Sequence, residues 1–153
     1  ALSTIKNSFD YYEKITTHDS SLSRCIFSIM AAKIGDKEKA YEYFDFSSKT
    51  DISNTQKNTK DGIHTASMGG TYMAVVYGFL GLRVKENGYF FCPCLPDKWN
   101  GIRLNLCFKG SRIEVFTDKE KCRFTLKKGD PVDLYVYDEK YCLTDKIEME
   151  IRE

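Results

Sequence analysis

In the first half of the chain, hydrophobic positions recur every three or four residues, which is the period of an amphipathic helix. One apolar stripe begins after Ser21 and predicts a helix that Gly35 ends; its members are Leu22, Cys25, Ile26, Ile29 and Met30. Asp36 is placed to cap a second helix, which we expect to continue to Lys49. The connection is so short that the two helices are expected to form a tight helical hairpin.

A polar segment, residues 51–62, follows this hairpin, and its composition is typical of a loop. A third helical pattern covers residues 65–82 and carries small residues that would let neighbouring segments approach closely: Ala66, Gly69, Gly70, Ala74 and Gly78. We therefore expect this helix to be buried on most sides. Three or four such helices need more apolar partners than this chain contains, so they indicate a part of a larger helical assembly.

After Gly88 the hydrophobic period changes from about 3.6 to 2, which indicates strands. The predicted strands are residues 89–94, 102–109, 112–117, 122–127, 132–137 and 146–152. They recur at intervals of about 8 to 12 residues with turn residues between them, as in an antiparallel sandwich or barrel. The pattern therefore predicts a helical domain, residues 1–88, followed by a small β domain, residues 89–153.

Composition and charge exclude several classes of protein. Of the 153 residues, 42% are hydrophobic, which is enough to bury a core. The formal net charge is +1 with acidic and basic residues interspersed, so no positive stripe is available for nucleic acid. The longest apolar stretch, residues 73–82, is about half the length that crosses a bilayer. We expect neither a membrane span nor an export signal.

The six cysteines stand at positions 25, 92, 94, 107, 122 and 142. Most of them alternate with apolar strand residues, where a reduced thiol behaves as a small buried hydrophobe. We interpret them as free thiols in a reducing cytoplasm. A metal site is not expected, because only Cys92 and Cys94 form a close pair and no second pair matches them.

Both histidines of the chain precede a predicted helix and are followed by hydroxyl side chains. His18 opens the sequence His-Asp-Ser-Ser-Leu-Ser, and His64 opens His-Thr-Ala-Ser-Met-Gly-Gly-Thr. Unpaired N–H groups at a helix amino terminus attract anions, and a histidine adds charge or a donor. Ordinary capping explains the first motif without a ligand, and tight packing explains the paired glycines of the second as well as a ligand does. In a helical barrel the two junctions can share one rim and converge on one phosphate.

The two motifs, in their order and spacing, resemble the end of the catalytic barrel of glycoside hydrolase family 65. Tyr11-Tyr12-Glu13 leads into the first motif, and Gly62-Ile63 leads into the second. Residues 90–99, Phe-Phe-Cys-Pro-Cys-Leu-Pro-Asp-Lys-Trp, resemble the family's entry into a small C-terminal β-sandwich. The family includes maltose, kojibiose and trehalose phosphorylases.

The resemblance implies an α+β multi-domain fold, with the last helices of an (α/α)6 barrel in residues 1–88 and a small antiparallel β-sandwich in residues 89–153. It also implies an inverting reaction in which inorganic phosphate attacks the anomeric carbon of an α-glucoside such as maltose. The products would be β-glucose 1-phosphate and glucose. Phosphate is then a co-substrate, no cofactor is needed, and the full-length protein is expected to be a homodimer.

The same resemblance assigns the phosphate end of the site to five positions, namely Ser20, Ser21, His64, Ser67 and Gly69. His18 and Asp19 take supporting positions. The general acid and most of the glucose pocket are expected upstream of residue 1, so no catalytic residue is assigned in this chain. Alone, the chain is expected to be inactive and to need the remainder of the barrel as its partner.

Two other functions stay open at this point. A family member that hydrolyses its substrate would leave the histidine and serine motifs without an anion. The other candidate is a non-catalytic carbohydrate-binding module, because aromatic side chains on a β-sandwich can stack on sugars. The aromatic residues considered for that role are Trp99, Tyr135, Tyr137 and Tyr141.

Overall fold

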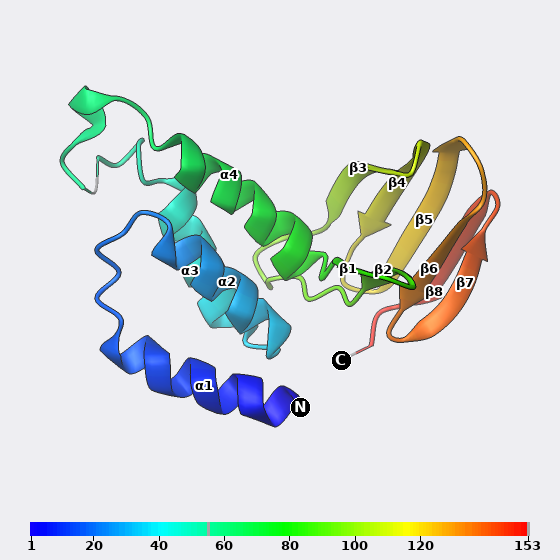
Figure 1. Ribbon diagram of the computed structural model, residues 1–153, viewed down its shortest axis with the longest axis horizontal. Coiled ribbons are helices and arrows are strands. Elements are labelled where there is room, and N and C mark those ends of the chain that lie inside the picture. The colour runs from blue at the N-terminus through cyan, green and yellow to red at the C-terminus, as the bar shows by residue number, and fades with distance from the viewer. Residues whose placement is uncertain (55, 153) are drawn as a thin grey trace. The chain divides into compact units, whose positions relative to one another are not determined.

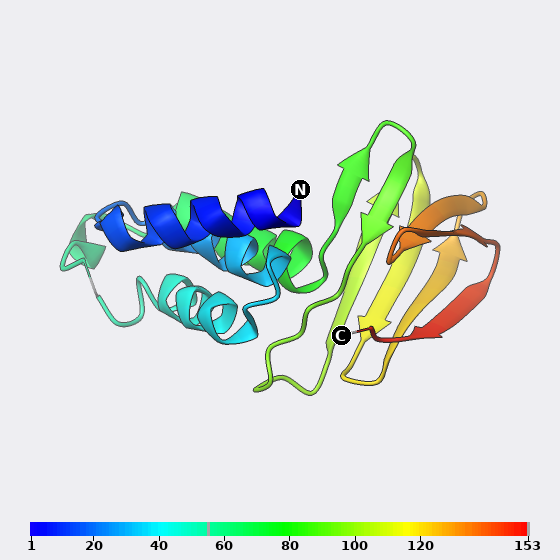
Figure 2. The same ribbon diagram turned by 90° about the horizontal axis from the view of Figure 1, so that it is seen from below.

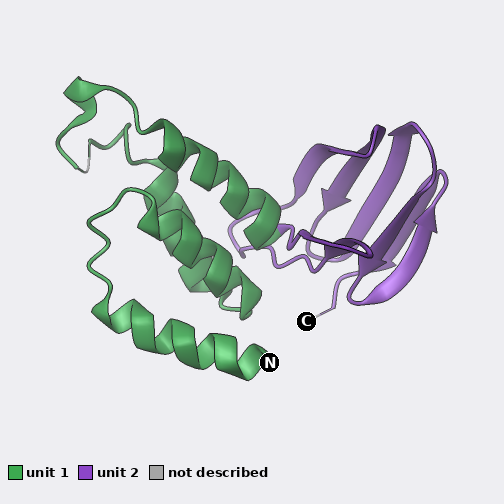
Figure 3. Cartoon of the chain, viewed as in Figure 1, with its two compact units in different colours: residues 1–79 green, residues 80–153 purple. Residues whose placement is uncertain are grey.

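The computed structural model describes residues 1–54 and 56–152, and the chain divides into two compact units, residues 1–79 and 80–153 (Figure 3). The first unit is helical, and the second consists of β-strands. The domain boundary expected at residue 88 stays a prediction, because compactness within this chain does not define the domain ends of a larger protein.

The helical elements follow one another along the first unit (Figures 1 and 2): α1 (Leu2–Ile15), α2 (Ser23–Lys33), α3 (Lys37–Ser48), the 3₁₀ turn η1 (Thr59–Asp61), α4 (Thr65–Met73) and the π-helical segment η2 (Ala74–Phe79). The cap of α3 is confirmed, since Asp36 Oδ1 accepts a hydrogen bond from the Lys39 N–H at 3.0 Å. The last helix ends at Phe79 rather than at residue 82, because Gly81 takes a φ of +67°, outside the helical region. Among the described residues, no helix is long and apolar enough to cross a membrane.

Helix α2 is the centre of the helical unit and contacts α1, α3, α4 and η2. It forms the expected hairpin with α3, where the buried Ser28 hydroxyl donates a hydrogen bond to the Ala40 carbonyl at 2.8 Å. Toward α4, Gly70 lies so close to Cys25 that a Cβ at position 70 would collide with the thiol sulfur. The small residues of α4 therefore include one that the packing requires.

Eight strands make up the second unit: β1 (Arg83–Lys85), β2 (Gly88–Phe91), β3 (Ile102–Phe108), β4 (Ser111–Thr117), β5 (Lys121–Lys128), β6 (Val132–Val136), β7 (Glu139–Leu143) and β8 (Lys146–Glu150). They form two four-stranded sheets, in the orders β1-β2-β6-β7 and β3-β4-β5-β8 (Figure 1). Neighbouring strands pair antiparallel, except that β2 and β6 are parallel. Buried Phe91 of one sheet meets buried Phe124 of the other, with ring centroids 4.7 Å apart. The predicted β-sandwich is confirmed.

Two strands of the sandwich were not predicted. β1 has three residues, two of them exposed, so it carries no alternating apolar pattern. For β7, no strand was predicted between residues 137 and 146, but Tyr137 and Asp138 form a turn and a strand begins at Glu139. Both turn residues have positive φ, 51° and 65°, as tight two-residue hairpins require.

The six cysteines, all in the described part of the chain, are free thiols. Cys25 and Cys122 are buried, and burial raises the pKa of the Cys122 thiol to about 12. The expectation that the strand cysteines are buried is wrong for Cys92, Cys107 and Cys142, which are exposed. Alternate residues of a strand face opposite sides, so a thiol between two core residues points outward. In residues 1–54 and 56–152, no group of three or more His, Cys, Asp or Glu side chains is arranged to hold a metal ion.

The entry to the β unit depends on Gly81, where a positive φ coincides with a close contact. A Cβ at Gly81 would collide with the carbonyl group of Cys92, whereas at Gly110 (φ +90°) it would meet no atom within 4 Å. We expect Gly110→Ala to lower the free energy of unfolding by the ~1–2 kcal/mol of a left-handed backbone, and Gly81→Ala to lower it clearly more. Urea unfolding of both variants measures this difference. Equal losses would mean that the contact with Cys92 relaxes.

Candidate polar cluster at two helix amino termini

The two histidine motifs lie side by side in the helical unit. Buried Ser67, in the first turn of α4, donates its hydroxyl hydrogen to the Ser21 carbonyl oxygen, just before α2, at 3.2 Å. The Ser67 hydroxyl oxygen also lies 3.4 Å from that of Ser47 on α3. Two loop-to-helix junctions, 46 residues apart in the sequence, therefore form one polar cluster.

Ser20 and Asp19 lie at the exposed side of this cluster. The Ser20 hydroxyl oxygen accepts a hydrogen bond from the Leu22 N–H at 3.3 Å, so its own hydrogen remains available to donate to an anion. The Asp19 carboxylate accepts the Thr17 hydroxyl at 2.7 Å, and its carbonyl accepts the Gln56 amide at 3.4 Å. These contacts hold the loop before α2 and suit Asp19 to a supporting position.

His64 is the residue before α4, and its side chain turns back toward Asp51 instead of capping the helix. Ring Nδ1 lies 2.5 Å from Asp51 Oδ1, and the His64 N–H donates to Asp51 Oδ2 at 3.0 Å. The hydrogen bond from the His64 ring, assisted by the one from its backbone, lowers the pKa of the Asp51 carboxyl. Sequence reasoning missed Asp51, because it stands in a polar loop 13 residues away with no local pattern to mark it.

His18 is held differently. Its φ is +57°, its Nδ1 lies 2.7 Å from the Ser23 hydroxyl oxygen, and its ring contacts those of Phe27 and Tyr43 at centroid distances of 4.7 and 5.2 Å. Nε2 is buried and has no hydrogen-bond partner among the described residues. Burial, and then the positive charge of Arg24, lower the pKa of His18. A neutral ring packed on aromatic side chains suits a residue that positions the loop.

Glu13 is a carboxylate next to this aromatic packing, and it is not suited to be a general acid. It forms an ion pair with Lys39 and accepts a hydrogen bond from the Tyr43 hydroxyl at 3.1 Å. The hydrogen bond from Lys39 is the main cause that lowers the pKa of Glu13. A general acid needs a raised pKa, so that it keeps its proton until the leaving group takes it.

The paired glycines of the second motif have different surroundings. Gly70 is buried against Cys25, so helix packing explains why no side chain is present there. Gly69 is exposed, and a Cβ there would meet no atom within 4 Å. Packing within this chain therefore does not explain Gly69, and this position leaves room for the close approach of a ligand or of another part of the protein.

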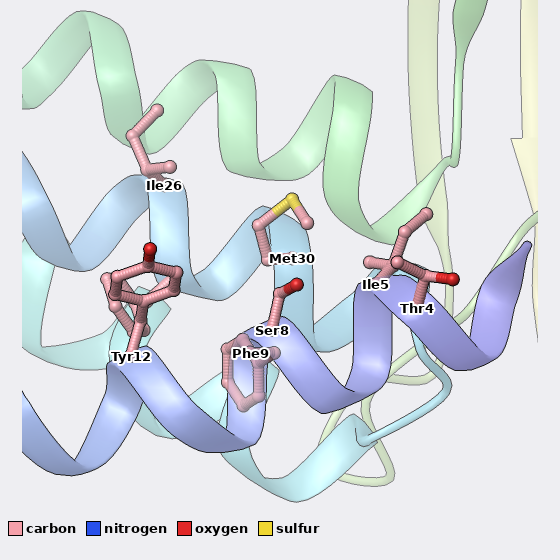
Figure 4. Close-up of a pocket in the computed structure, with 8 residues that line it drawn as sticks. Thr4, Ile5, Ser8, Phe9, Tyr12, Ile26 and Met30 are labelled. Carbon is pink, nitrogen blue, oxygen red and sulfur yellow. The ribbon is translucent and has the colours of Figure 1, made fainter.

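An apolar groove of about 270 Å³ lies between α1 and α2 (Figure 4). Its lining includes Ile5, Phe9, Tyr12, Ile26, Phe27 and Met30. It contains no charged side chain, so it does not fit an anion. Leu2 and Ile15 at the two ends of α1 are also about 60% exposed (59% and 60%), which leaves apolar helix surface for further helices to cover.

Family comparisons agree with the two kinds of structure along the chain. Residues 1–73 match the glycosyl hydrolase family 65 central catalytic domain, and residues 82–143 match the family 65 C-terminal domain. This chain belongs to glycoside hydrolase family 65, as the motifs indicated. It combines part of the central catalytic domain with the C-terminal domain.

Individual relatives extend the comparison. The α,α-trehalose phosphorylase of Geobacillus stearothermophilus is 50% identical over 149 residues, which are 97% of this chain and 20% of that protein. The maltose phosphorylase of Bacillus subtilis (strain 168) is 34% identical over 143 residues, 94% of this chain and 19% of that protein. A solved structure described as a kojibiose phosphorylase from the human microbiome has a TM-score of 0.94 and 34% identity, and the match covers 100% of this chain and 23% of that one. The chain thus spans about one fifth of the length of its relatives.

The half-buried His18 ring predicts a pH dependence of stability. Because the pKa of His18 is lowered in the fold, the unfolded chain binds the proton more tightly than the folded chain. The neutral ring therefore contributes to the free energy of unfolding at neutral pH, and this contribution is lost as the pH falls below the ordinary histidine value of about 6.5. His18→Asn keeps a residue type that tolerates positive φ but does not titrate. We expect a smaller difference in unfolding free energy between pH 7.5 and pH 5.5 for this variant, measured in urea. An unchanged difference would contradict the assignment to His18.

Proposed function

We propose that this chain is the C-terminal part of an inverting phosphorylase that transfers a glucosyl group from an α-glucoside to inorganic phosphate. The products are β-glucose 1-phosphate and the released sugar. The observation that carries the proposal is the hydrogen bond between Ser67 and Ser21, since it brings two helix amino termini and their hydroxyl groups to one place. The names of the relatives, which are phosphorylases, support the reaction class.

In this proposal phosphate lies against the polar cluster. The exposed Ser20 hydroxyl and the Ser21 backbone approach it from the loop before α2, while His64 and the backbone N–H groups at the start of α4 approach it from the other side. Gly69 leaves room for the anion. The Ser67 hydroxyl is engaged with Ser21, so Ser67 contributes by fixing the loop and through its backbone. Phosphate acts as co-substrate, and no cofactor takes part.

The rest of the catalytic machinery belongs to the part of the protein that precedes this chain. The family resemblance implies that the general acid lies there, and Glu13, which is paired with Lys39, does not fit that role. The preceding barrel helices cover the apolar groove between α1 and α2. The chain alone is inactive, and the full-length protein works as a cytoplasmic homodimer.

One observation bears on the choice of disaccharide. Identity is higher to the trehalose phosphorylase than to the maltose phosphorylase, 50% against 34% over similar lengths. This difference favours α,α-trehalose ahead of maltose as the substrate.

A carbohydrate-binding module is the weaker candidate. Trp99, Tyr135, Tyr137 and Tyr141 are all half-buried rather than exposed. Tyr135 stacks on Phe90 at a centroid distance of 4.2 Å, so its ring face is already used within the sandwich. A surface for sugar stacking needs open aromatic faces.

The test is phosphorolysis by the full-length protein. We expect α,α-trehalose to give β-glucose 1-phosphate only when phosphate is present, and maltose and kojibiose to react more slowly. His64→Ala should lower kcat/KM for phosphate by about 100-fold, because it removes a hydrogen-bond partner of the charged phosphate. Asp45→Asn, which changes an exposed ion pair with Lys49, is the control and should retain the activity. Release of free glucose alone, at a rate independent of phosphate, would reject phosphorolysis in favour of hydrolysis.

Gly69 supplies a second test of where phosphate lies. Gly69→Ala should raise the stability of the 153-residue chain by up to about 1 kcal/mol, because alanine is the better helix former and the site is open. In the full-length protein the same change should raise KM for phosphate several-fold, because the new methyl group occupies the space of the anion. Gly70→Ala is the comparison: it should destabilise the chain by about 1–3 kcal/mol through its collision with Cys25. An unchanged phosphate KM for Gly69→Ala would place the anion elsewhere.

A further inference from the structure

Asp51 engages His64 with both of its carboxylate oxygens. Oδ1 lies 2.5 Å from ring Nδ1, and Oδ2 accepts the His64 backbone N–H at 3.0 Å. The two side chains are only 14% and 16% exposed, so the pair lies largely out of water, where charge-assisted hydrogen bonds are stronger. Two contacts to one residue fix both the backbone that enters α4 and the orientation of the ring.

These contacts also determine where the ring carries its proton. A backbone N–H only donates, and an ionised carboxylate only accepts, so Asp51 has no hydrogen to offer to Nδ1. Nδ1 therefore keeps its proton and donates it to Oδ1. The described residues provide no hydrogen-bond partner for Nε2, which leaves this atom to act on a ligand.

We propose that Asp51 is a positioning residue of the phosphate site, which holds His64 with Nδ1 protonated and Nε2 presented to the anion. This inference rests on the proposed function. When the ring is charged, Nε2–H donates to a phosphate oxygen; when it is neutral, Nε2 accepts the P–OH hydrogen of dihydrogen phosphate. In both states one proton lies between Nε2 and phosphate. Both oxygens of the carboxylate are engaged by His64, and when the ring is charged its positive charge offsets the negative charge of the carboxylate.

Asp51→Asn in the full-length protein tests the proposal. The amide oxygen can accept the His64 N–H, but the NH₂ group then faces Nδ1 and favours the other tautomer, and the charge is lost. We expect KM for phosphate to rise by about tenfold or more, and KM for the disaccharide to change by less than about twofold. Asp45→Asn is the matched control, since Asp45 forms an exposed ion pair with Lys49 at 2.7 Å; it should leave both values unchanged.

A double-mutant cycle shows whether Asp51 acts through the ring. In a His64→Ala background, Asp51→Asn should have no further effect on KM for phosphate. A full additional loss in that background would mean that Asp51 acts through the loop alone, and it would overturn the proposal. An unchanged phosphate KM for the Asp51→Asn protein would overturn the proposal as well.

A second variant covers the case in which Asp51→Asn does not fold. Asp51→Ser leaves a shorter polar side chain near the His64 backbone N–H and removes the contact to the ring, so the same rise in phosphate KM and the same cycle are expected. An Asp51→Ser protein with unmodified phosphate KM overturns the proposal. If the unmodified protein lacks phosphate-dependent turnover, the proposed function fails and this inference fails with it. If that turnover is present, the contrary results with the Asp51 variants reject this inference alone.

Discussion

The close approach of α2 and α4 is the contact on which the polar cluster depends. Gly70 makes it possible, because a side chain at this position would displace the thiol of Cys25. Ser67 lies about one turn before Gly70 on α4, and Ser21 lies in the turn that leads into α2, four residues before Cys25. The contact between Gly70 and Cys25 and the hydrogen bond from Ser67 to the Ser21 carbonyl are therefore neighbours. The packing of Gly70 against Cys25 thus lies beside the hydrogen-bonded groups of Ser67 and Ser21.

The two histidines show how similar local sequences acquire different roles. Each stands before a helix and is followed by hydroxyl residues, but aromatic rings surround His18 while a carboxylate holds His64. Desolvation lowers the pKa of His18, whereas the ring and the backbone N–H of His64 are held by hydrogen bonds to Asp51. His18 is thereby suited to holding a loop, and His64 to meeting an anion.

The β-sandwich is stabilised in another way, by apolar alternation rather than by single close contacts. Along β4 and β6, buried and less buried residues alternate strictly, and the inward-facing side chains of the two sheets meet at Phe91 and Phe124. Charged side chains on the outer faces pair across strands, as Lys127 does with Glu114 at 3.2 Å. Such exposed pairs add little stability, so the core carries the fold.

By itself, the sequence determined the features that arise between residues close in the chain. The hairpin of α2 and α3, the Asp36 cap and the alternating strands were predicted because helix and strand periods and caps involve neighbours within about four residues. The two histidine junctions were also located, since their pattern is local. Only the tertiary structure decided which distant groups meet: Asp51 with His64, Ser67 with Ser21, and β2 beside β6 in parallel. Those pairings depend on the path of the intervening loops, which no local period encodes, and β1 forms only because β2 offers it a partner edge.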